Sequence, residues 1–424
     1  MMEYLRRIID SELDELFDEI PALAIDGLKG IGKTTTAQQR AARVFALDAK
    51  AVRETVEADP SRICSGERPV LVDEWQKLPE VWDVVRRAVD ANPKGGQFLL
   101  VGSATPAPHA TAHTGAGRIG RLRMRPLTLS ERGLTRPTVS LRDLLAGGRP
   151  LLTGDCELAL SDYVAAIVSS GFPAVRLMSD RARNFQLDSY LRNVVDRDVP
   201  EQGLAVRRAD AMLAWLRAYA AATATTASYS QILNAATPGL GEKPARSTSV
   251  AYRDVLTGLW LLDPVPAWQP TGSFLTRLGQ SPKHHLADPA LAARLLGLTR
   301  DSLLDGEGES LDPRAGGILG ALFESLVTLC VRVPAQAAEA SIGHLRTRNG
   351  DHEVDLMVMR PDGRVLAIEV KLAGSVRDGD VKHLRWLEQQ LGSRLLDSLV
   401  VTTGRSAYRR KDGVGVVPLG LLAP

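Results

Sequence analysis

The hydrophobic pattern of the first hundred residues alternates between helices and strands. Apolar side chains recur at helical spacing over residues 3–19, and an apolar run at 22–25 follows directly after Pro21. Two more apolar runs, at 70–72 and 98–101, read as strands, and residues 35–46 read as a helix. Because strands and helices alternate, we predict the α/β class, with a parallel sheet and crossover helices.

The pattern changes to mostly helical between about residues 162 and 268. Three predicted helices, at 209–222, 228–236 and 247–256, precede the apolar segment GLWLLDPVPAW, which reads as a strand and a proline-containing hairpin. This order predicts a winged-helix-like middle segment. If its third helix faced a DNA groove, it would present Arg246, Ser247, Ser249, Tyr252 and Arg253. The alternative is a rigid connector between domains.

The last hundred residues predict a second, smaller α/β unit. A helix from about residue 318 precedes two or three strands, a helix at 381–391 and a final strand at 398–402. We therefore expect three domains: an N-terminal α/β domain at 1–145, the winged-helix-like segment at 146–270, and the smaller α/β domain at 271–424.

Composition limits the compartment and the partners. The 52 basic and 50 acidic side chains give a formal net charge of +2, so any attraction for nucleic acid must be local. Three widely spaced cysteines fit neither a disulfide framework nor a zinc site. No uninterrupted apolar run approaches the ~20 residues of a membrane span. These features predict a cytoplasmic protein with no membrane partner.

The segment GLKGIGKT at residues 27–34 matches the phosphate-binding pattern G-x-x-x-x-G-K-[ST]. A strand before it and a helix after it place backbone N–H groups where they bind phosphate oxygens. We expect Lys33 to reach the β and γ phosphates of ATP, and the Thr34 hydroxyl to ligate Mg²⁺. The predicted nucleotide-binding residues are Gly27, Gly30, Ile31, Gly32, Lys33, Thr34 and Thr35.

Carboxylates at the end of a neighbouring strand complete the predicted ATPase site. Asp73 and Glu74 follow the run Val70 to Val72, so we expect Asp73 to hold Mg²⁺ through water and Glu74 to polarise the attacking water. Ser103 follows the strand at 98–101 and is a candidate to hold that water or sense the γ-phosphate.

A cluster of arginines follows, at positions 118, 121, 123 and 125. The last three alternate with Leu122 and Met124, which predicts a strand with an arginine face, or alternatively a solvated edge.

These motifs, with the stretch TGAGRIGRLRMRPLTLSE, resemble prokaryotic AAA+ ATPases that carry a C-terminal domain of unknown function 4143. The resemblance implies that Arg118 is an arginine finger or γ-phosphate sensor, acting within one chain or between copies of a homo-oligomer. Gly171-Phe172-Pro173 and Arg197-Asp198 also match the family, and we expect packing roles for them.

The second informative stretch is a predicted hairpin around Pro361-Asp362-Gly363. With Asp362 at its centre, opposing residue numbers sum to 724, so Asp355 faces Glu369 and Glu353 faces Lys371. Two acids and a lysine on one patch are what a magnesium-dependent phosphodiesterase requires, with Asp355 and Glu369 as metal ligands. The alternative is a salt-bridge ladder.

The spacing D-x13-E-x-K resembles the PD-(D/E)xK nuclease fold, with Glu324 on the preceding helix as a further acid. Two hypotheses follow. In the first, an ATP-hydrolysing AAA+-like protein acts on DNA or RNA through a nuclease-like C-terminal domain. In the second, the protein is an ATP-gated binding switch for a protein partner, and its nuclease-like module is inactive.

Overall fold

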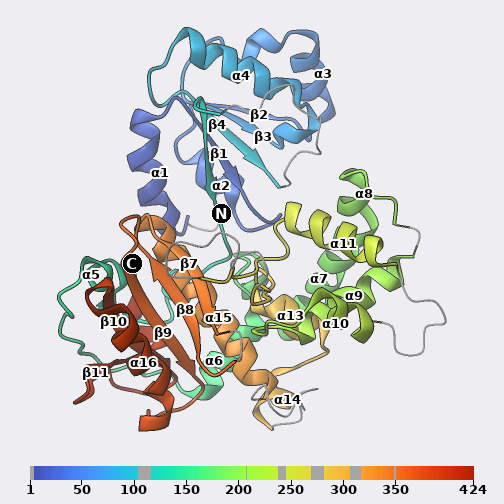
Figure 1. Ribbon diagram of the computed structural model, residues 1–424. Helices are drawn as coiled ribbons and strands as arrows, with labels where there is room; N and C mark the ends of the chain where they lie inside the picture. Colours follow the sequence, from blue (N-terminus) through green and yellow to red (C-terminus); the bar gives the residue numbers. More distant parts are fainter. Residues whose placement is uncertain are drawn as a thin grey trace.

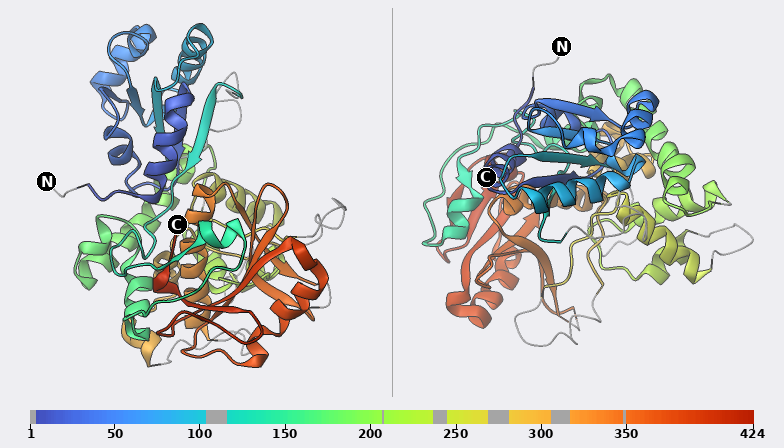
Figure 2. Two further views of the ribbon diagram at one scale, coloured as in Figure 1. Left: turned by 90° about the vertical axis from the view of Figure 1, so that its left-hand side faces the viewer. Right: turned by 90° about the horizontal axis from the view of Figure 1, so that it is seen from above.

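The computed structural model describes residues 4–103, 116–206, 208–236, 245–268, 281–305, 317–347 and 350–424. An N-terminal sheet domain stands beside two further parts, a helical middle part and a C-terminal sheet domain (Figure 1). Two further views show helices on both faces of the N-terminal sheet (Figure 2).

The N-terminal domain is built from alternating helices and strands. In chain order they are α1 (Ile8–Glu19), β1 (Ala22–Asp26), α2 (Lys33–Gln38), β2 (Arg43–Ala46), α3 (Lys50–Ala58), β3 (Val70–Asp73), α4 (Glu80–Ala91), β4 (Phe98–Gly102) and β5 (Ile119–Arg123). The strands pair in parallel in the order β2-β3-β4-β1-β5. The predicted parallel α/β sheet is therefore confirmed, and β1 and β3 are each adjacent to β4.

The prediction of a helix at 35–46 is wrong for the second half of that range. Helix α2 ends at Gln38, and residues 43–46 form strand β2. Val44 pairs with Leu71 and Phe45 with Val72 in the parallel register. Aromatic and β-branched side chains suit a pleated surface, and pairing with β3 outweighs the helix propensity of the neighbouring alanines.

The middle part is helical. It contains α6 (Leu160–Ser169), α7 (Asp180–Asn193), α8 (Val199–Glu201), α9 (Ala209–Ala221), α10 (Tyr229–Ala235), α11 (Arg246–Gly258), α13 (Pro289–Leu295) and α14 (Arg300–Leu304). After α11, Leu262 and Val265 form antiparallel bridges with Leu286 and Lys283. The three predicted helices are confirmed. The segment predicted to hold both a strand and a hairpin instead forms isolated bridges with residues 283 and 286, and the winged-helix interpretation stays a prediction.

Two of the five side chains proposed to face DNA are inside the protein. Ser249 accepts a hydrogen bond from Trp215 Nε1 at 2.8 Å, and both Ser249 and Tyr252 are buried. Helix α11 uses this face to pack on α9, so these two residues are not available for nucleic acid, and the expectation is wrong for them.

The C-terminal domain is a mixed sheet with a helix on each face. Its elements are α15 (Ile318–Ala337), β7 (Ser341–Arg346), β8 (Glu353–Met359), β9 (Val365–Lys371), α16 (Lys382–Leu391), β10 (Leu395–Thr402), β11 (Tyr408–Arg409), β12 (Gly415–Pro418) and β13 (Leu422–Ala423). Six strands follow the order β11-β12-β10-β9-β8-β7. Leu356 pairs with Ile368 and Met359 with Val365, so the predicted register is confirmed for the part of the hairpin next to the turn, whereas the predicted pairs of Asp355 and Glu353 lie beyond it.

Residues 139–146 lie between the first two domains in the sequence, but they pack in the C-terminal domain. Strand β6 (Val139–Ser140) pairs in parallel with β13, and α5 (Leu141–Ala146) packs on β9, β10 and α15. The chain therefore crosses to the C-terminal domain before it enters the middle helices.

Helix α15 is the core helix of this domain. By length and composition alone it is apolar enough to cross a membrane, but 67% of its most apolar window is buried inside the protein. It packs against α1, α5, α6, α13, β7 and β9. Its partly buried Glu324 and its buried Arg332 form ion pairs within the protein, which is the pattern of a buried core helix.

Candidate nucleotide site and C-terminal acidic cluster

The loop between β1 and α2 has the backbone shape of a phosphate-binding loop. Gly27, Gly30 and Gly32 have φ of +149°, +80° and +99°, which L-residues rarely adopt. A Cβ atom at Gly27 would lie 2.3 Å from the carbonyl oxygen of Met124. Glycine is therefore required there by both the backbone conformation and the close approach of the segment after β5.

Lys33 is buried at the first position of α2. Its Nζ donates hydrogen bonds to the carbonyl oxygens of Gly27 and Leu28 at 2.8 and 2.5 Å. Burial lowers the pKa of Lys33 to about 8, although the nearby Glu74 and Asp73 oppose the shift. A buried ammonium whose partners are neutral carbonyls suits a polyanion such as a triphosphate.

Thr34 and Asp73 meet at the carboxyl edge of the sheet. The Thr34 hydroxyl donates to Asp73 Oδ1 at 2.9 Å, and burial raises the pKa of Asp73. A hydroxyl and a carboxylate at hydrogen-bond distance beside a phosphate-binding loop are the oxygen donors that Mg²⁺ prefers. The residues present therefore fit a nucleotide with its magnesium ion, with Thr34 and Asp73 as the residues that would hold the metal.

Glu74 is held by two neighbours. It has φ of +52°, which turns the chain sharply after β3. Gln76 Nε2 donates to its carboxylate at 2.5 Å, and Ser103 Oγ lies 3.3 and 3.4 Å from its two oxygens. Ser103, which follows β4, therefore lies beside Glu74, and its role toward the attacking water or the γ-phosphate stays a prediction. Gln76 was missed, and its only sequence signal is its place two residues after Glu74.

Arg118 does not meet the phosphate-binding loop of its own chain. Ala22, the first residue of β1, pairs with Ile119, so Arg118 lies at the amino edge of the sheet, away from the loop. Its Nε donates to Asp90 at 2.9 Å on the surface. The expectation that Arg118 acts within one chain is wrong, and its action on another copy stays a prediction.

The remaining arginines of that stretch connect domains. Asp263 accepts from Arg123 and Arg125 at 2.9 Å each, and it also pairs with Arg332 of α15. The solvated-edge alternative is therefore wrong for Arg123 and Arg125. Arg121 instead contacts Asp26 of β1 at 2.8 Å. The arginine face of β5 thus packs the N-terminal sheet against the rest of the protein.

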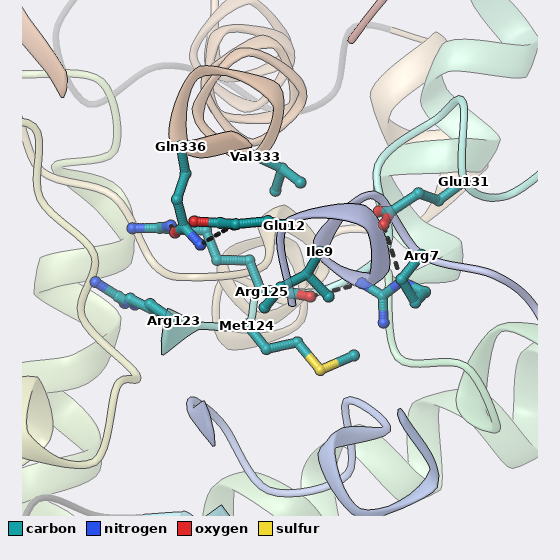
Figure 3. Close-up of a pocket in the computed structure, with 9 residues that line it drawn as sticks. All are labelled: Arg7, Ile9, Glu12, Arg123, Met124, Arg125, Glu131, Val333 and Gln336. Atoms are coloured by element: carbon teal, nitrogen blue, oxygen red, sulfur yellow. Dashed lines mark hydrogen bonds and ion pairs between the residues drawn. The ribbon is translucent and has the colours of Figure 1, made fainter. Parts of the chain in front are cut away.

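Arg7 supports the phosphate-binding loop from the N-terminal side. Its guanidinium donates to the carbonyl oxygens of Ile31 at 3.1 Å and Arg125 at 2.8 Å, while its Nε pairs with Glu131 at 2.9 Å. Figure 3 shows this pair beside a cavity of about 10 Å³, large enough for a single water. Glu131, the last residue of the stretch TGAGRIGRLRMRPLTLSE, therefore holds the Arg7 side chain in place. Sequence reasoning missed Arg7 because its partners lie far along the chain.

The middle part covers the same loop. Lys29 Nζ lies 2.5 Å from Asp198 Oδ1, and Lys77 contacts Glu201 at 3.0 Å. A Cβ atom at Gly30 would lie 3.5 Å from the Phe172 ring, so this ring lies directly beside the loop. Phe172 and Asp198, two of the residues for which we expected packing roles, therefore contact this loop.

The predicted C-terminal acids surround a lysine that the sequence did not indicate. Lys283 is fully buried, and its Nζ lies 2.8 Å from Glu324 Oε1, 2.8 Å from Asp355 Oδ1 and 3.4 Å from Glu353 Oε1. The other oxygen of Asp355 accepts from the backbone N–H of Val370 at 2.8 Å.

Beside this cluster, Lys371 pairs with Glu369 at 2.9 Å. Burial raises the pKa values of Glu324 and Glu369 to about 8, and the neighbouring Asp355 adds to both shifts. Burial alone would lower the pKa of Lys283, but Asp355, Glu324 and Glu353 outweigh it and raise the pKa well above its ordinary value.

These contacts contradict the predicted metal site. Among the residues that the structure describes, no group of three or more histidine, cysteine, aspartate or glutamate side chains can hold a metal ion. The ammonium of Lys283 lies where Asp355 and Glu324 converge, and Lys371 neutralises Glu369. The expectation that Asp355 and Glu369 ligate a metal in this protein is therefore wrong. No local pattern in the sequence indicated that Lys283 contacts these acids, since it precedes Asp355 by 72 residues.

Family models match three consecutive stretches of the chain. Residues 19–132 match an AAA domain, residues 160–302 a domain of unknown function (DUF8612), and residues 319–422 another domain of unknown function (DUF4143). Together with the loop geometry, these matches make the N-terminal part an AAA-type P-loop domain, and the chain carries a DUF4143 domain at its C-terminus.

Two curated relatives are similar over nearly the whole chain. They are the uncharacterized proteins Rv2008c of Mycobacterium tuberculosis and Mb2031c of Mycobacterium bovis, each 26% identical over 97% of this chain and 83% of the relative. A solved structure, the RuvB Holliday junction branch migration motor of Thermotoga maritima, matches 60% of this chain and 86% of its own at 17% identity and a TM-score of 0.26. That score is too low to indicate a shared overall fold.

Proposed function

We propose that this protein binds and hydrolyses ATP and uses the nucleotide as a switch, with a C-terminal domain that binds a partner and does not cleave nucleic acid. The observation that carries the first half is the assembly of Lys33, Thr34, Asp73 and Glu74 at one edge of the sheet. The pairing of Lys283 with Glu324 and Asp355 supports the second half.

Different residues of the chain have different roles at the proposed nucleotide site. Backbone N–H groups of the glycine loop and the ammonium of Lys33 bind the phosphates. Thr34 and Asp73 would hold a magnesium ion, which supplies charge neutralisation when bound. Glu74 accepts a proton from, or orients, the attacking water, and Gln76 and Ser103 fix its carboxylate.

The middle part is placed to respond to the nucleotide. It contacts the glycine loop through Asp198 and Phe172, and the segment after β3 through Glu201. A change in loop shape therefore changes contacts that also hold the middle helices. We propose that this rearrangement gives the C-terminal domain its partner-binding state.

The C-terminal domain has the order helix, three strands, helix, strand in α15, β7, β8, β9, α16 and β10. This order resembles the PD-(D/E)xK fold, so we propose a nuclease-like module without cleavage activity. Its partner in this proposal is a protein, and nucleic acid is the alternative that the experiment separates.

The test measures ATP turnover and nucleic-acid cleavage in the same samples. The wild-type protein is assayed with Mg²⁺ or Mn²⁺, with and without single- and double-stranded DNA and RNA. We expect turnover by the wild type and a fall of about 10² or more in Glu74→Gln with ATP binding retained, because removal of one catalytic group typically has an effect of this size. We expect no cleavage.

The matched control is Glu80→Gln, an exposed glutamate at the start of α4, which should hydrolyse ATP at the wild-type rate. Equal rates for Glu74→Gln and wild type would reject the ATPase assignment. Metal-dependent cleavage that Lys371→Ala abolishes would reject the binding-module assignment and favour the nucleic-acid enzyme.

A further inference from the structure

Lys29 is a second lysine of the glycine loop. Its Nζ lies 2.5 Å from Asp198 Oδ1, and 39% of the Lys29 side chain is accessible but only 11% of the Asp198 side chain. Burial lowers the pKa of Lys33 to about 8, and the charge of Lys29 adds to this shift, so the two ammonium groups lie near each other. Among the residues that the structure describes, only the ammonium of Lys29 forms an ion pair; that of Lys33 donates to carbonyl groups.

Residues 194–201 of the middle part, here called the clamp segment, contact both sides of the nucleotide site. The first five residues form a π-helical turn and the last three form α8. Asp198 pairs with Lys29 of the glycine loop, and Glu201 pairs with Lys77 of the segment after β3. π-helical turns are uncommon and are found frequently at functional sites. Two acids of one short segment therefore lie at the edge where the nucleotide loop and the catalytic carboxylates meet.

We propose that Lys29 is a phosphate-binding residue of this loop, and that Asp198 pairs with its ammonium in the nucleotide-free protein until a phosphate group of ATP replaces the carboxylate. Carboxylate and phosphate oxygens are both anionic acceptors, and they repel each other when they meet at one ammonium. ATP binding then releases the clamp segment from the loop. The inference rests on the proposed nucleotide switch and names the contact through which the nucleotide acts.

The physical argument is one of charge. A triphosphate is a polyanion, and Asp198 and Glu201 are additional negative charges at its proposed binding edge. Because Asp198 is mostly buried, solvent and salt screen its repulsion of phosphate only weakly. Exchange of the carboxylate for phosphate keeps Lys29 paired and moves the displaced acid toward solvent, where its charge is hydrated.

The test measures the affinity of the full-length protein for AMP-PNP, a non-hydrolysable ATP analogue, in the presence of Mg²⁺ by isothermal titration calorimetry. We expect Asp198→Asn to bind about fivefold or more tightly than the wild type, because the competing carboxylate is gone. Lys29→Ala should bind about tenfold or more weakly, because a phosphate loses a cationic partner. Added to Lys29→Ala, Asp198→Asn should raise the affinity by less than it does in the wild type, since the two residues share one interaction.

Asp196→Asn is the matched control. Asp196 lies on the same π-helical turn, is exposed and forms no ion pair with the described residues, so its variant should bind AMP-PNP like the wild type. A purely structural role of Asp198 predicts the opposite sign, because loss of the ion pair would loosen the loop and weaken binding. Equal or weaker binding by Asp198→Asn therefore overturns the proposal, as does wild-type affinity in Lys29→Ala.

Hydrogen–deuterium exchange adds a measurement that needs no substitution and that decides the matter if Asp198→Asn does not fold. AMP-PNP should speed up the amide exchange of residues 194–201 in the wild type, because the clamp segment loses its contact with Lys29. Slower or unchanged exchange of this segment overturns its release.

Failure of this inference is distinguishable from failure of the proposed function. Absence of AMP-PNP binding to the wild type would reject the nucleotide site and this inference with it, whereas binding without the expected effect of Asp198→Asn rejects only the exchange at Lys29. Unchanged turnover in Glu74→Gln rejects the ATPase assignment, and the AMP-PNP measurements do not depend on turnover.

Discussion

Lys33 and Lys283 are both buried lysines, but their surroundings shift their pKa values in opposite directions. Lys33 donates to two neutral carbonyl groups, so burial dominates and lowers its pKa to about 8. Burial also acts against the charge of Lys283, but Asp355 and Glu324 lie close enough to outweigh it. The attraction of an ionised carboxylate offsets the free-energy cost of removing the ammonium from water, whereas a neutral carbonyl group offsets only part of that cost.

The lowered pKa of Lys33 predicts a pH dependence for ATP binding. Below pH 8 the ammonium is already charged, whereas above pH 8 it is neutral and must take up a proton when phosphate binds. Affinity for ATP should therefore fall as pH rises from 8 to 9.5, by up to about tenfold per pH unit. Isothermal titration calorimetry in two buffers of different ionisation enthalpy measures the proton uptake directly.

The control for this prediction is Lys33→Arg, whose guanidinium stays charged across this range. Any ATP binding that it retains should show no proton uptake at pH 9. Binding to the wild type without proton uptake at pH 9 would contradict the assignment of Lys33.

At the scale of elements, strand β5 explains how the N-terminal sheet attaches to the rest. Among the described residues β5 is the edge strand of this sheet. Arg123 of β5 pairs with Asp263, which follows α11 and also pairs with Arg332 of α15. Burial raises the pKa of Asp263, but the three arginines outweigh this and hold it well below its ordinary value. The stabilisation is thus present above the ordinary carboxyl pKa and is lost as pH falls through the lowered value.

Asp263→Asn should destabilise the protein strongly. It leaves the buried charges of Arg123, Arg125 and Arg332 without their carboxylate, a change that typically costs about 3 to 5 kcal/mol and lowers the melting temperature by about 5 to 15 °C. Differential scanning calorimetry of the nucleotide-free protein measures the shift.

Asp362→Asn is the matched control. Asp362 pairs with Arg360 and Arg364 in a surface turn, where solvent screens the charges, so its melting temperature should stay near that of the wild type. Equal melting temperatures for the two variants would show that the Asp263 cluster does not hold the domains together.

At the scale of the whole molecule, contacts between domains decide how the sites are arranged. The middle part packs on the glycine loop, and Lys283 joins the middle to the C-terminal domain. Residues 139–146 leave the N-terminal domain and pack within the C-terminal one. The glycine loop and the acidic cluster therefore each contact residues of the middle part.

Phe172→Ala tests whether the middle part supports the nucleotide loop. Phe172 is buried beside Gly30 and makes an edge contact with Tyr190 at 5.1 Å between ring centroids. Truncation leaves a cavity under the loop, so ATP affinity should fall about tenfold, because small displacements of binding groups have effects of this size. Titration with a fluorescent ATP analogue, well below the melting temperature, measures this change.

Phe185→Ala removes the same side chain from an exposed position on α7 and should bind ATP like the wild type. If the two variants bind ATP equally well, the middle part does not determine the shape of the loop.

Local patterns in the sequence predicted a large part of the fold. The glycine loop, strands β1, β3 and β4 and the hairpin register follow from residues that are neighbours in the chain. Period-2 alternation and a defined turn fix which residues oppose each other in a hairpin, and the register followed without knowledge of the rest of the molecule. Ser103 was a candidate to hold the attacking water, and it lies beside Glu74 because the carboxyl ends of parallel strands share one edge of the sheet.

Only the tertiary structure decided what those residues contact. Lys283, Arg7 and Asp198 act on groups far along the chain, and Arg118 lies at the edge of the sheet opposite to the nucleotide loop. Ion pairs of this kind depend on how whole domains pack against each other, and no periodic pattern in a single sequence predicts that packing. For that reason the sequence by itself determined the nucleotide loop and the acidic hairpin, while the fold decided that a lysine from another domain lies among those acids.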